Sequence, residues 1–276
     1  MTEFIQKLRE DKVGLIGLIG VLIVIVLALL APLIAPYAPD EMHTEQVMHS
    51  PSSEFLFGTD EFGRDIFSRI VYGAQVSLQV GLIAVGIGAT FGLIFGLLAG
   101  FYQGKLDSII MRIMDIFFAF PDILLALTII AVLGPSLTNT MVAIGIVFTP
   151  VFTRLIRSAV LTVKENEYIL NAKAVGVSNI KIILKHITPN VMAPFIVQIT
   201  LALSGAILTE AALSFLGLGV QPPNPSWGVM LNESRAYMEF APWMTIFPVA
   251  AIIITIFCFN LLGDSLRDLL DPKLRQ

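Results

Sequence analysis

Long apolar runs constrain this chain more than any other feature of its sequence. An α-helix needs about 20 predominantly apolar residues to cross the hydrocarbon core of a bilayer. Hydrophobic residues make up 56% of the 276 residues and charged residues only 14%, which leaves too little polar surface for a soluble protein of this length. The sequence therefore predicts an all-α polytopic membrane protein with six transmembrane helices, over residues 13–33, 76–101, 113–133, 138–158, 192–213 and 242–263.

The third and the first of these runs differ from a simple transmembrane helix. Asp115, Pro121 and Asp122 interrupt the third run, so its first two turns are candidates for lying along the membrane surface. The first run follows a short charged start and resembles a signal peptide. However, the apolar region of a signal peptide is usually about 7–15 residues long. The longer run here favours a retained membrane helix.

The distribution of basic residues predicts the orientation. With the N-terminus inside, 14 of the 17 Lys and Arg residues fall on the inner side, and only Arg64, Arg69 and Arg235 fall outside. Cytoplasmic loops carry the excess of Lys and Arg. We therefore expect both termini, and the loop of residues 164–190, to be cytoplasmic.

The loop 164–190 is polar and basic although apolar runs flank it. It predicts two short helices, over about 166–175 and 179–187, with a break at Gly176, because a glycine just past a helix tolerates a positive φ. Ser178 is a candidate cap for the second helix, and Pro189 is expected to end it. A polar hairpin cannot be buried in lipid, so it should dock onto a cytoplasmic protein. Its predicted apolar stripe consists of Tyr168, Ile169, Ala172 and Val175.

Glycines recur every four residues in the second run, at Gly88, Gly92, Gly96 and Gly100. Such a row lets another helix backbone approach closely. It predicts a helix-packing face, either within the chain or against a second subunit.

The segment between the first two runs is rich in Pro, His and acidic residues, followed by a polar motif over 58–69. No metal site is expected, because the spacing of its histidines matches no closed ligand set. In the motif, Asp65 and Arg69 are spaced i,i+4 and are predicted to pair, with Asp60 and Arg64 beside them.

Glu210 is a carboxylate within the fifth run, where a charge is expensive and should face protein or water. With Ser214 nearby, one interpretation is a gate or the lining of a transport path. The other is a residue near the outer membrane edge that is hydrogen-bonded to a neighbouring span. Both interpretations remain open from the sequence.

Catalytic motifs are absent from the sequence. There is no HExxH, no GxSxG and no P-loop pattern. Asp264 and Asp268 lie one turn apart, which suggests a polar helix end beside basic loops. The net charge of −4 gives no support for nucleic-acid binding. The single cysteine, Cys258, is expected to be a small buried side chain. If the chain moves a solute uphill, the energy should come from another subunit.

Several motifs together resemble the inner-membrane permease subunits of ATP-binding-cassette (ABC) importers, specifically C-type permeases of the dipeptide/oligopeptide/nickel family. The sequence is similar to GTDxxGRDxxSR at 58–69, LSFLGLG at 213–219, WGxM at 227–230 and GDxLRDxLDPxLR at 263–275. Residues 170–176 resemble the EAAxxxG motif, followed at the expected distance by Pro189. Leu170 and Asn171 stand where the motif has Glu and Ala.

The resemblance implies a type I, MetI-like permease fold in a bacterial or archaeal cytoplasmic membrane. Residues 1–75 would form an N-terminal helix with an outer segment, and residues 76–276 a five-helix core. The chain would pair with a second permease, and a solute-binding protein would deliver di- or oligopeptides. Two cytoplasmic ATPases would hold the ATP and Mg²⁺, so this chain would bind no cofactor. They would contact the loop 164–190, hereafter the coupling loop, through Glu167, Tyr168, Ile169, Asn171, Ala172, Lys173, Ala174, Gly176 and Ser178.

Other functions stay open at this stage. Within the same architecture, the substrate could be nickel or another metal chelate. A self-sufficient secondary carrier would need internal ion-coupling sites, and a non-transporting assembly factor would leave the coupling loop without an ATPase. If the loop couples transport, Ala172→Asp or Gly176→Asp should uncouple uptake while membrane insertion stays intact.

Overall fold

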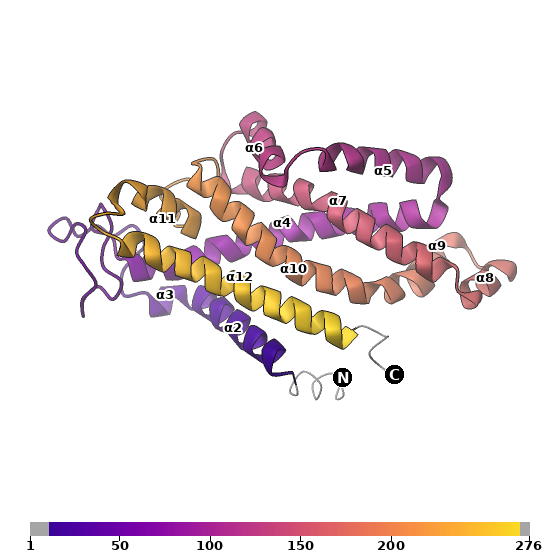
Figure 1. The fold of residues 1–276 in the computed structure, drawn as a ribbon, viewed down its shortest axis with the longest axis horizontal. Coiled ribbons are helices and arrows are strands. Elements are labelled where there is room, and N and C mark those ends of the chain that lie inside the picture. Colours follow the sequence, from indigo (N-terminus) through magenta and orange to yellow (C-terminus); the bar gives the residue numbers. More distant parts are fainter. Residues whose placement is uncertain (1–10, 271–276) are drawn as a thin grey trace.

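Five helices of the computed structural model are long and apolar enough to cross a membrane, and one bent helix pair makes up to six (Figure 1). The structure describes residues 11–270. The early basic residues Lys7 and Arg9, and residues 271–275 of the C-terminal motif, lie outside the described residues. The five helices are α2 (Lys12–Leu29), α4 (Ile66–Tyr102), α7 (Leu137–Lys164), α10 (Thr188–Phe215) and α12 (Trp243–Leu270).

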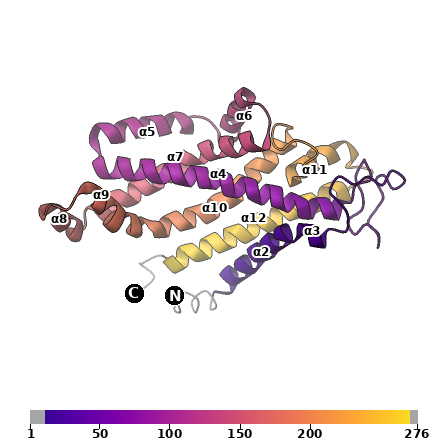
Figure 2. The same cartoon turned by 180° about the vertical axis from the view of Figure 1, so that it is seen from behind.

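Shorter helices complete the described part of the chain. They are α3 (Ala31–Ile34), α5 (Gly104–Phe118), α6 (Asp122–Leu133), α8 (Glu167–Ala174), α9 (Asn179–Ile182), the π-helical turn η1 (Ile183–Ile187), α11 (Trp227–Ser234) and the 3₁₀ turn η2 (Arg235–Tyr237). Helices α8 and α9 form one end of the long bundle, and the loops before α4 and around α11 gather at the opposite end (Figures 1 and 2). The coupling loop and the 58–69 motif therefore lie at opposite ends of the molecule.

Two apolar cores hold the bundle together. The larger one lies where α4, α7 and α10 meet, and includes Phe152, Ile156 and Val191. The second joins α2 and α12 to the N-terminal part of α4, the C-terminal part of α10 and α11, and includes Trp227 and Cys258. Exposed isoleucines and leucines on α2 and α12 face away from both cores, as expected for helices that contact lipid.

The glycine row of α4 lies against α7 of the same chain. A Cβ atom added at Gly92, Gly96 or Gly100 would meet side chains of α7 at less than van der Waals distance, among them Ile156 and Val160. Gly145 makes the reciprocal approach from α7 to α4. Of the two alternatives that the sequence left open, the structure shows the contact within the chain.

The third predicted span is not a single helix. Its residues are divided between α5 and α6, which are bent by 93° at residues 119–121. Pro121 lacks the backbone N–H that a continuous helix would need, and it disfavours a helical conformation at the residue before it. The helix also begins at Gly104, nine residues before the predicted start.

Several other helices extend beyond the predicted boundaries, whereas α2 ends at Leu29, four residues before its predicted end. Helix α4 begins at Ile66 instead of 76, because Asp65 caps it. Helices α7 and α12 continue several residues past the predicted inner ends. Apolar composition marks the part of a helix that lipid surrounds, and it misses the polar turns beyond the bilayer.

Candidate functional site

The coupling loop folds as two short helices joined at Gly176. Helix α8 ends there because Gly176 adopts a φ of +80°, as the sequence predicted. Its N–H donates to the carbonyl of Lys173, and the N–H of Val177 donates to the carbonyl of Ala172, both at 3.0 Å. Ser178 precedes α9, but its side chain makes no capping hydrogen bond.

Pro189 does not end the second helix of the loop, which corrects the prediction. Helix α9 runs through η1 directly into α10, so that residues 179–215 form one continuous helix. Pro189 lies inside this continuous helix, near the start of α10, and has no backbone N–H to donate. The wider turn of η1 just before it accommodates the missing donor.

The apolar residues of α8 are divided between the interior and the surface. Ile169 is fully buried in the chain's own core, and Ala172 packs partly against that core. The prediction that Ile169 belongs to an apolar stripe open to a partner is therefore wrong, and Ala172 is only partly open to one. The exposed apolar side chains are Tyr168, Leu170 and Val175, and Val175 is 79% exposed.

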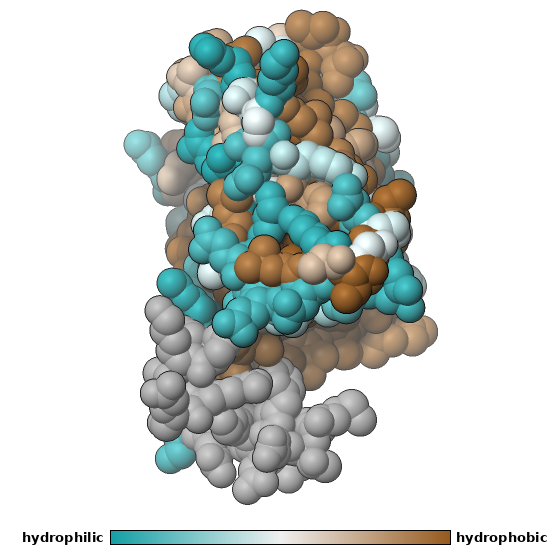
Figure 3. All heavy atoms as spheres, turned by 90° about the vertical axis from the view of Figure 1, so that its right-hand side faces the viewer, coloured by the Kyte–Doolittle hydropathy of each residue, from teal (hydrophilic) through white to brown (hydrophobic). Residues whose placement is uncertain are grey.

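Figure 3 shows the end of the bundle where this loop lies, with hydrophilic residues over much of it and apolar patches between them. The exposed polar residues of the predicted coupling set are Glu167, Asn171, Lys173 and Ser178. Ala174 and Gly176 are exposed beside them. The loop thus presents a mixed surface to the solvent.

The base of the coupling loop is attached to the C-terminal end of α4. Lys164 donates a hydrogen bond to the carbonyl of Phe101 at 2.6 Å. The ammonium of Lys173 lies 5.0 Å from the centroid of the Phe101 ring, within the range of a cation–π contact. Lys173, a member of the predicted ATPase-coupling set, therefore also contacts its own chain.

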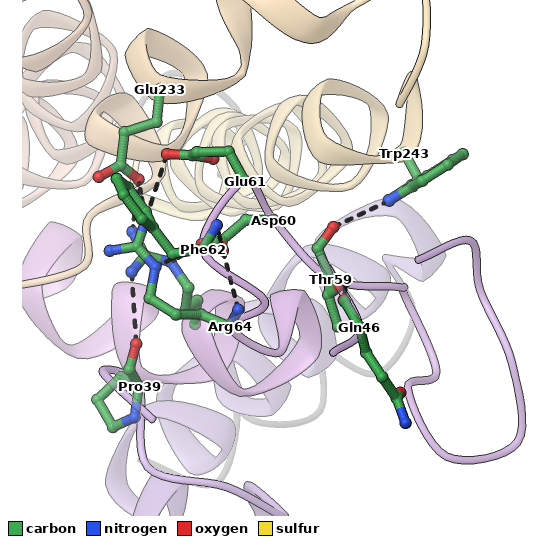
Figure 4. Close-up of polar contacts among 10 residues, drawn as sticks. Pro39, Gln46, Thr59, Asp60, Glu61, Phe62, Arg64, Glu233 and Trp243 are labelled. Atoms are coloured by element: carbon green, nitrogen blue, oxygen red, sulfur yellow. Dashed lines mark hydrogen bonds and ion pairs between the residues drawn. The ribbon is translucent and has the colours of Figure 1, made fainter. Parts of the chain in front are cut away.

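At the opposite end of the bundle, two arginines and two carboxylates form what we call the outer ion-pair cluster: Asp60, Arg64, Arg69 and Glu233 (Figure 4). Nε of Arg64 lies 2.6 Å from Oδ2 of Asp60, and Nη2 of Arg69 lies 2.7 Å from Oε2 of Glu233. Arg64 also reaches Glu233 at 3.2 Å. Because Glu233 belongs to α11, the cluster fastens the 58–69 motif to a distant part of the chain.

The predicted pair between Asp65 and Arg69 is wrong. Oδ2 of Asp65 instead accepts hydrogen bonds from the backbone N–H and the hydroxyl of Ser68, at 2.8 and 2.7 Å. Asp65 thereby caps α4, since a carboxylate satisfies the free N–H groups of a first helical turn. Arg69 is left to bind Glu233 and Asp60.

Glu61 lies beside the outer ion-pair cluster, in an environment that is unfavourable for a charged carboxylate. Its Oε1 lies 3.4 Å from Arg64, while Oε2 is buried without a partner among the described residues. Burial raises the pKa of the Glu61 carboxyl, and the charges of Asp60 and Glu233 act in the same direction. Burial and the neighbouring carboxylates therefore both disfavour the charged form of Glu61.

The remaining polar contacts tie the outer segments together. Nε1 of Trp243 donates to the carbonyl of Thr59 at 3.2 Å, and Arg69 donates to the carbonyl of Pro39 at 3.4 Å (Figure 4). The backbone N–H of His49 donates to the Thr59 hydroxyl at 2.8 Å. The segment before α4 is thus held against α12 as well as α11.

Glu210 and Ser214 do not line an open path in this structure. Both are buried. The Ser214 hydroxyl donates to Oε1 of Glu210 at 2.8 Å, and the Ser77 hydroxyl of α4 donates to Oε2 at 3.2 Å. Ser214 also accepts from the N–H of Val220 at 3.0 Å. This arrangement favours the second interpretation, a carboxylate hydrogen-bonded to a neighbouring span, and it anchors the loop after α10.

Sequence reasoning missed Glu233 and two further ion pairs. Arg157 donates hydrogen bonds from Nε and Nη2 to the two carboxylate oxygens of Asp107. Nη2 of Arg154 lies 2.6 Å from Oδ1 of Asp115. Each pair joins α5 to α7. The signal was present in the sequence, since each of these arginines lies near an apolar run and needs a partner, but only the folded chain identifies which acid supplies it.

Comparisons with known proteins agree with this geometry. Residues 92–276 match the family described as binding-protein-dependent transport system inner membrane component. Residues 1–51 match the N-terminal TM domain of oligopeptide transport permease C. The chain is 50% identical over 273 residues to a dipeptide transport system permease protein DppC of Alkalihalophilus pseudofirmus, covering 99% of this chain and 90% of that protein. It is 47% identical over 243 residues to a glutathione transport system permease protein GsiD of Escherichia coli, covering 88% and 80%.

Solved structures share the fold at low identity. An inward-facing conformation of the MetNI methionine ABC transporter aligns with a TM-score of 0.63 at 18% identity, over 75% of this chain and 98% of that chain. An amino acid ABC transporter structure aligns with a TM-score of 0.57 at 14% identity, over 73% and 94%. The chain therefore belongs to the binding-protein-dependent transport system inner membrane component family, as a DppC/OppC-like, multi-pass permease subunit of a bacterial ABC importer.

Proposed function

We propose that this permease carries di- or oligopeptides into the cytoplasm as part of an ATP-driven importer. In this proposal it pairs with a second permease to enclose the path, and two cytoplasmic ATPases hold ATP and Mg²⁺. An external solute-binding protein delivers the peptide. Both chain termini and the coupling loop lie in the cytoplasm.

The observation that carries the coupling role is the surface of α8 and α9. These helices project at the end of the bundle, opposite the outer ion-pair cluster (Figures 1 and 2). They expose Leu170, Val175 and Ile180, by 53%, 79% and 67%. Apolar side chains exposed together on a loop favour contact with another protein. Because α9 continues into α10, a partner that moves the loop would move a membrane helix directly.

The peptide substrate is supported by the 50% identity to a protein named as a dipeptide permease. The relatives named as glutathione permeases, at 47% identity, favour a second candidate. Glutathione is itself a short peptide, so both candidates share the charged ends and the amide backbone.

Purification of the tagged chain from its own membrane tests the partners. We expect a second permease and two P-loop ATPases to be isolated with it, and the assembly to hydrolyse ATP faster when the loaded solute-binding protein is added. Isolation of the chain alone, with uptake that continues without ATP, would contradict the proposal and favour a secondary carrier.

The ligand of the partner solute-binding protein tests the substrate. Mass spectrometry of the protein isolated from cells should find a dipeptide or longer peptide. Reduced glutathione at one equivalent would favour the second candidate, and a bound nickel chelate would contradict both.

A further inference from the structure

The ion pair between Asp115 of α5 and Arg154 of α7 is exposed where lipid would be a poor environment. Their side chains are 57% and 45% exposed, and Nη2 of Arg154 lies 2.6 Å from Oδ1 of Asp115. Arg154 lies ten residues before the inner end of α7 at Lys164, or about 15 Å along the helix axis. Helix α7 has 28 residues and is about 42 Å long, against a hydrocarbon core of about 30 Å. The pair therefore lies inside the membrane.

Arg154 cannot readily extend to the inner surface. Side chains on a helix lean toward its N-terminus, and the N-terminal end of α7 is the end away from the coupling loop. The contact with Asp115 and the stacking of the guanidinium 3.7 Å from the centroid of the Phe118 ring hold it at this depth.

The bend between α5 and α6 gives a second, independent reason. Residues 119–121 are outside both helices and are all exposed. Irregular backbone at membrane depth is tolerated where protein buries it or where it lines a water-filled cavity. The bend follows Phe118 directly, so the exposed backbone and the exposed ion pair lie on adjoining parts of one surface.

The same face of α7 continues as a polar surface toward the cytoplasm. Ser158 and Thr162 follow Arg154 at four-residue intervals, which places them on one face, and both are exposed. Beside this face, a cavity of about 470 Å³ lies between α7, α10 and α12, with Leu155, Asn190, Gln198 and Arg267 among its lining residues. A helix face that exposes Ser158 and Thr162 beyond Arg154 fits water better than lipid.

We propose that the Asp115–Arg154 pair lines the translocation path and binds the two charged ends of a passing peptide; this rests on the proposed function. Arg154 uses one of its N–H groups on Asp115, and its other N–H groups and Oδ2 of Asp115 have no hydrogen-bond partner within residues 11–270. A guanidinium can take a carboxylate by two parallel bonds, and a carboxylate can take an ammonium group. An electrically neutral pair thus matches a zwitterionic peptide, which is also neutral.

Thiol labelling of the assembled transporter in membrane vesicles tests whether the pair faces water. Cys258 is the single cysteine of this chain, so Cys258→Ala removes the native thiol from this chain, on which the labelling is then measured. We expect Arg154→Cys and Asp115→Cys to react with a charged methanethiosulfonate reagent at least ten times faster than Phe257→Cys. Phe257 is an exposed apolar residue about 20 Å from the inner end of α12 and serves as the control. Rates equal to that of the control would overturn the proposal.

Protection tests the role in peptide binding. Alanyl-alanine at saturating concentration should slow the modification of both cysteines at least five-fold, and its N-acetylated amide, which has no charged end, should not. Fast modification that neither compound slows would overturn the assignment to the peptide. Wild-type vesicles that take up no peptide would contradict the proposed function instead, and the labelling rates without peptide would still decide whether the pair faces water.

Discussion

The two ends of this permease are built in opposite ways. At the outer end, four charged side chains of the outer ion-pair cluster are at most 17% exposed and join the 58–69 motif to α11. At the inner end, the coupling loop leaves its apolar residues Leu170 and Val175 in the solvent. A region whose charged side chains pair within the chain needs no partner to satisfy them. A region that exposes apolar side chains favours contact with another protein. Under the proposed function, the end with the outer ion-pair cluster would be the rigid one and the end with the coupling loop would receive the movement.

The largest effect is expected from removing a charge of the outer cluster. Arg69→Ala removes one of the two arginines that Asp60 and Glu233 share and leaves both carboxylates to Arg64 alone in a buried site, which costs about 3–5 kcal/mol. The purified assembly should lose its thermal transition at the wild-type temperature or fail to accumulate. Arg235→Ala changes an exposed arginine two residues from Glu233 and should leave the transition unchanged. Equal stability of the two variants would remove the contrast between the two ends.

Charges placed on the exposed surface of the coupling loop should affect transport without affecting stability. We expect Leu170→Asp or Val175→Asp to lower ATP-dependent uptake at least ten-fold, because a carboxylate replaces an apolar contact with the ATPase. Thermal unfolding should match the wild type. Ala172→Asp is a poorer test than the sequence suggested, because Ala172 packs against the chain's own core and its replacement should also destabilise the fold.

Two glycines provide a matched comparison with a smaller effect. Gly176 at the inner end and Gly217 at the outer end have φ values of +80° and +79°, and neither has an atom within 4 Å of an added Cβ. Alanine should therefore cost about the same at both positions, about 1–2 kcal/mol of local strain. Gly176→Ala should reduce the coupling of ATP hydrolysis to uptake several-fold, and Gly217→Ala should change it less than two-fold. Equal losses would indicate that the coupling loop has no special role.

The smallest effect concerns the protonation of Glu61. Because burial raises its pKa above the ordinary value, the folded state holds this proton more tightly than the unfolded chain does. The stabilisation is present at pH values below the ordinary Glu pKa and is lost as pH rises through the raised pKa. Glu61→Gln cannot ionise, so the stability of this variant relative to wild type should increase as pH rises through that window. Parallel pH profiles of the thermal midpoint would contradict the assignment.

Much of the fold was predictable because lipid imposes a simple rule on helix length and composition. The six apolar runs, the positive φ at Gly176 and the close approach at the α4 glycine row follow from local chemistry. The pairing of charges was not predictable, because it depends on tertiary contacts between residues far apart in sequence. Arg69 had an acid at the helical spacing in Asp65, yet Asp65 satisfied free backbone groups and Arg69 bound Glu233.

The coupling loop shows the same division. The sequence identified its position and its two helices, but a four-residue spacing cannot tell which side of a short amphipathic helix the chain keeps for itself. The structure assigns Ile169 to the interior and Leu170 to the surface. Pro189 was expected to stop a helix, but the helix continues because the wider π-helical turn η1 just before it accommodates the missing N–H.

The continuous helix from Asn179 to Phe215 has a mechanical consequence. Its 37 residues make a rod about 55 Å long. A tilt of about 5° would displace one end relative to the other by about 5 Å, a distance comparable to one helical turn. Glu210 and Ser214 secure the far end of this lever to α4 and to the loop that follows. The wider turn at η1 is the point where this helix can bend. The stiffness of its five residues therefore determines how much of a displacement of the coupling loop is transmitted along the helix to Glu210 and Ser214.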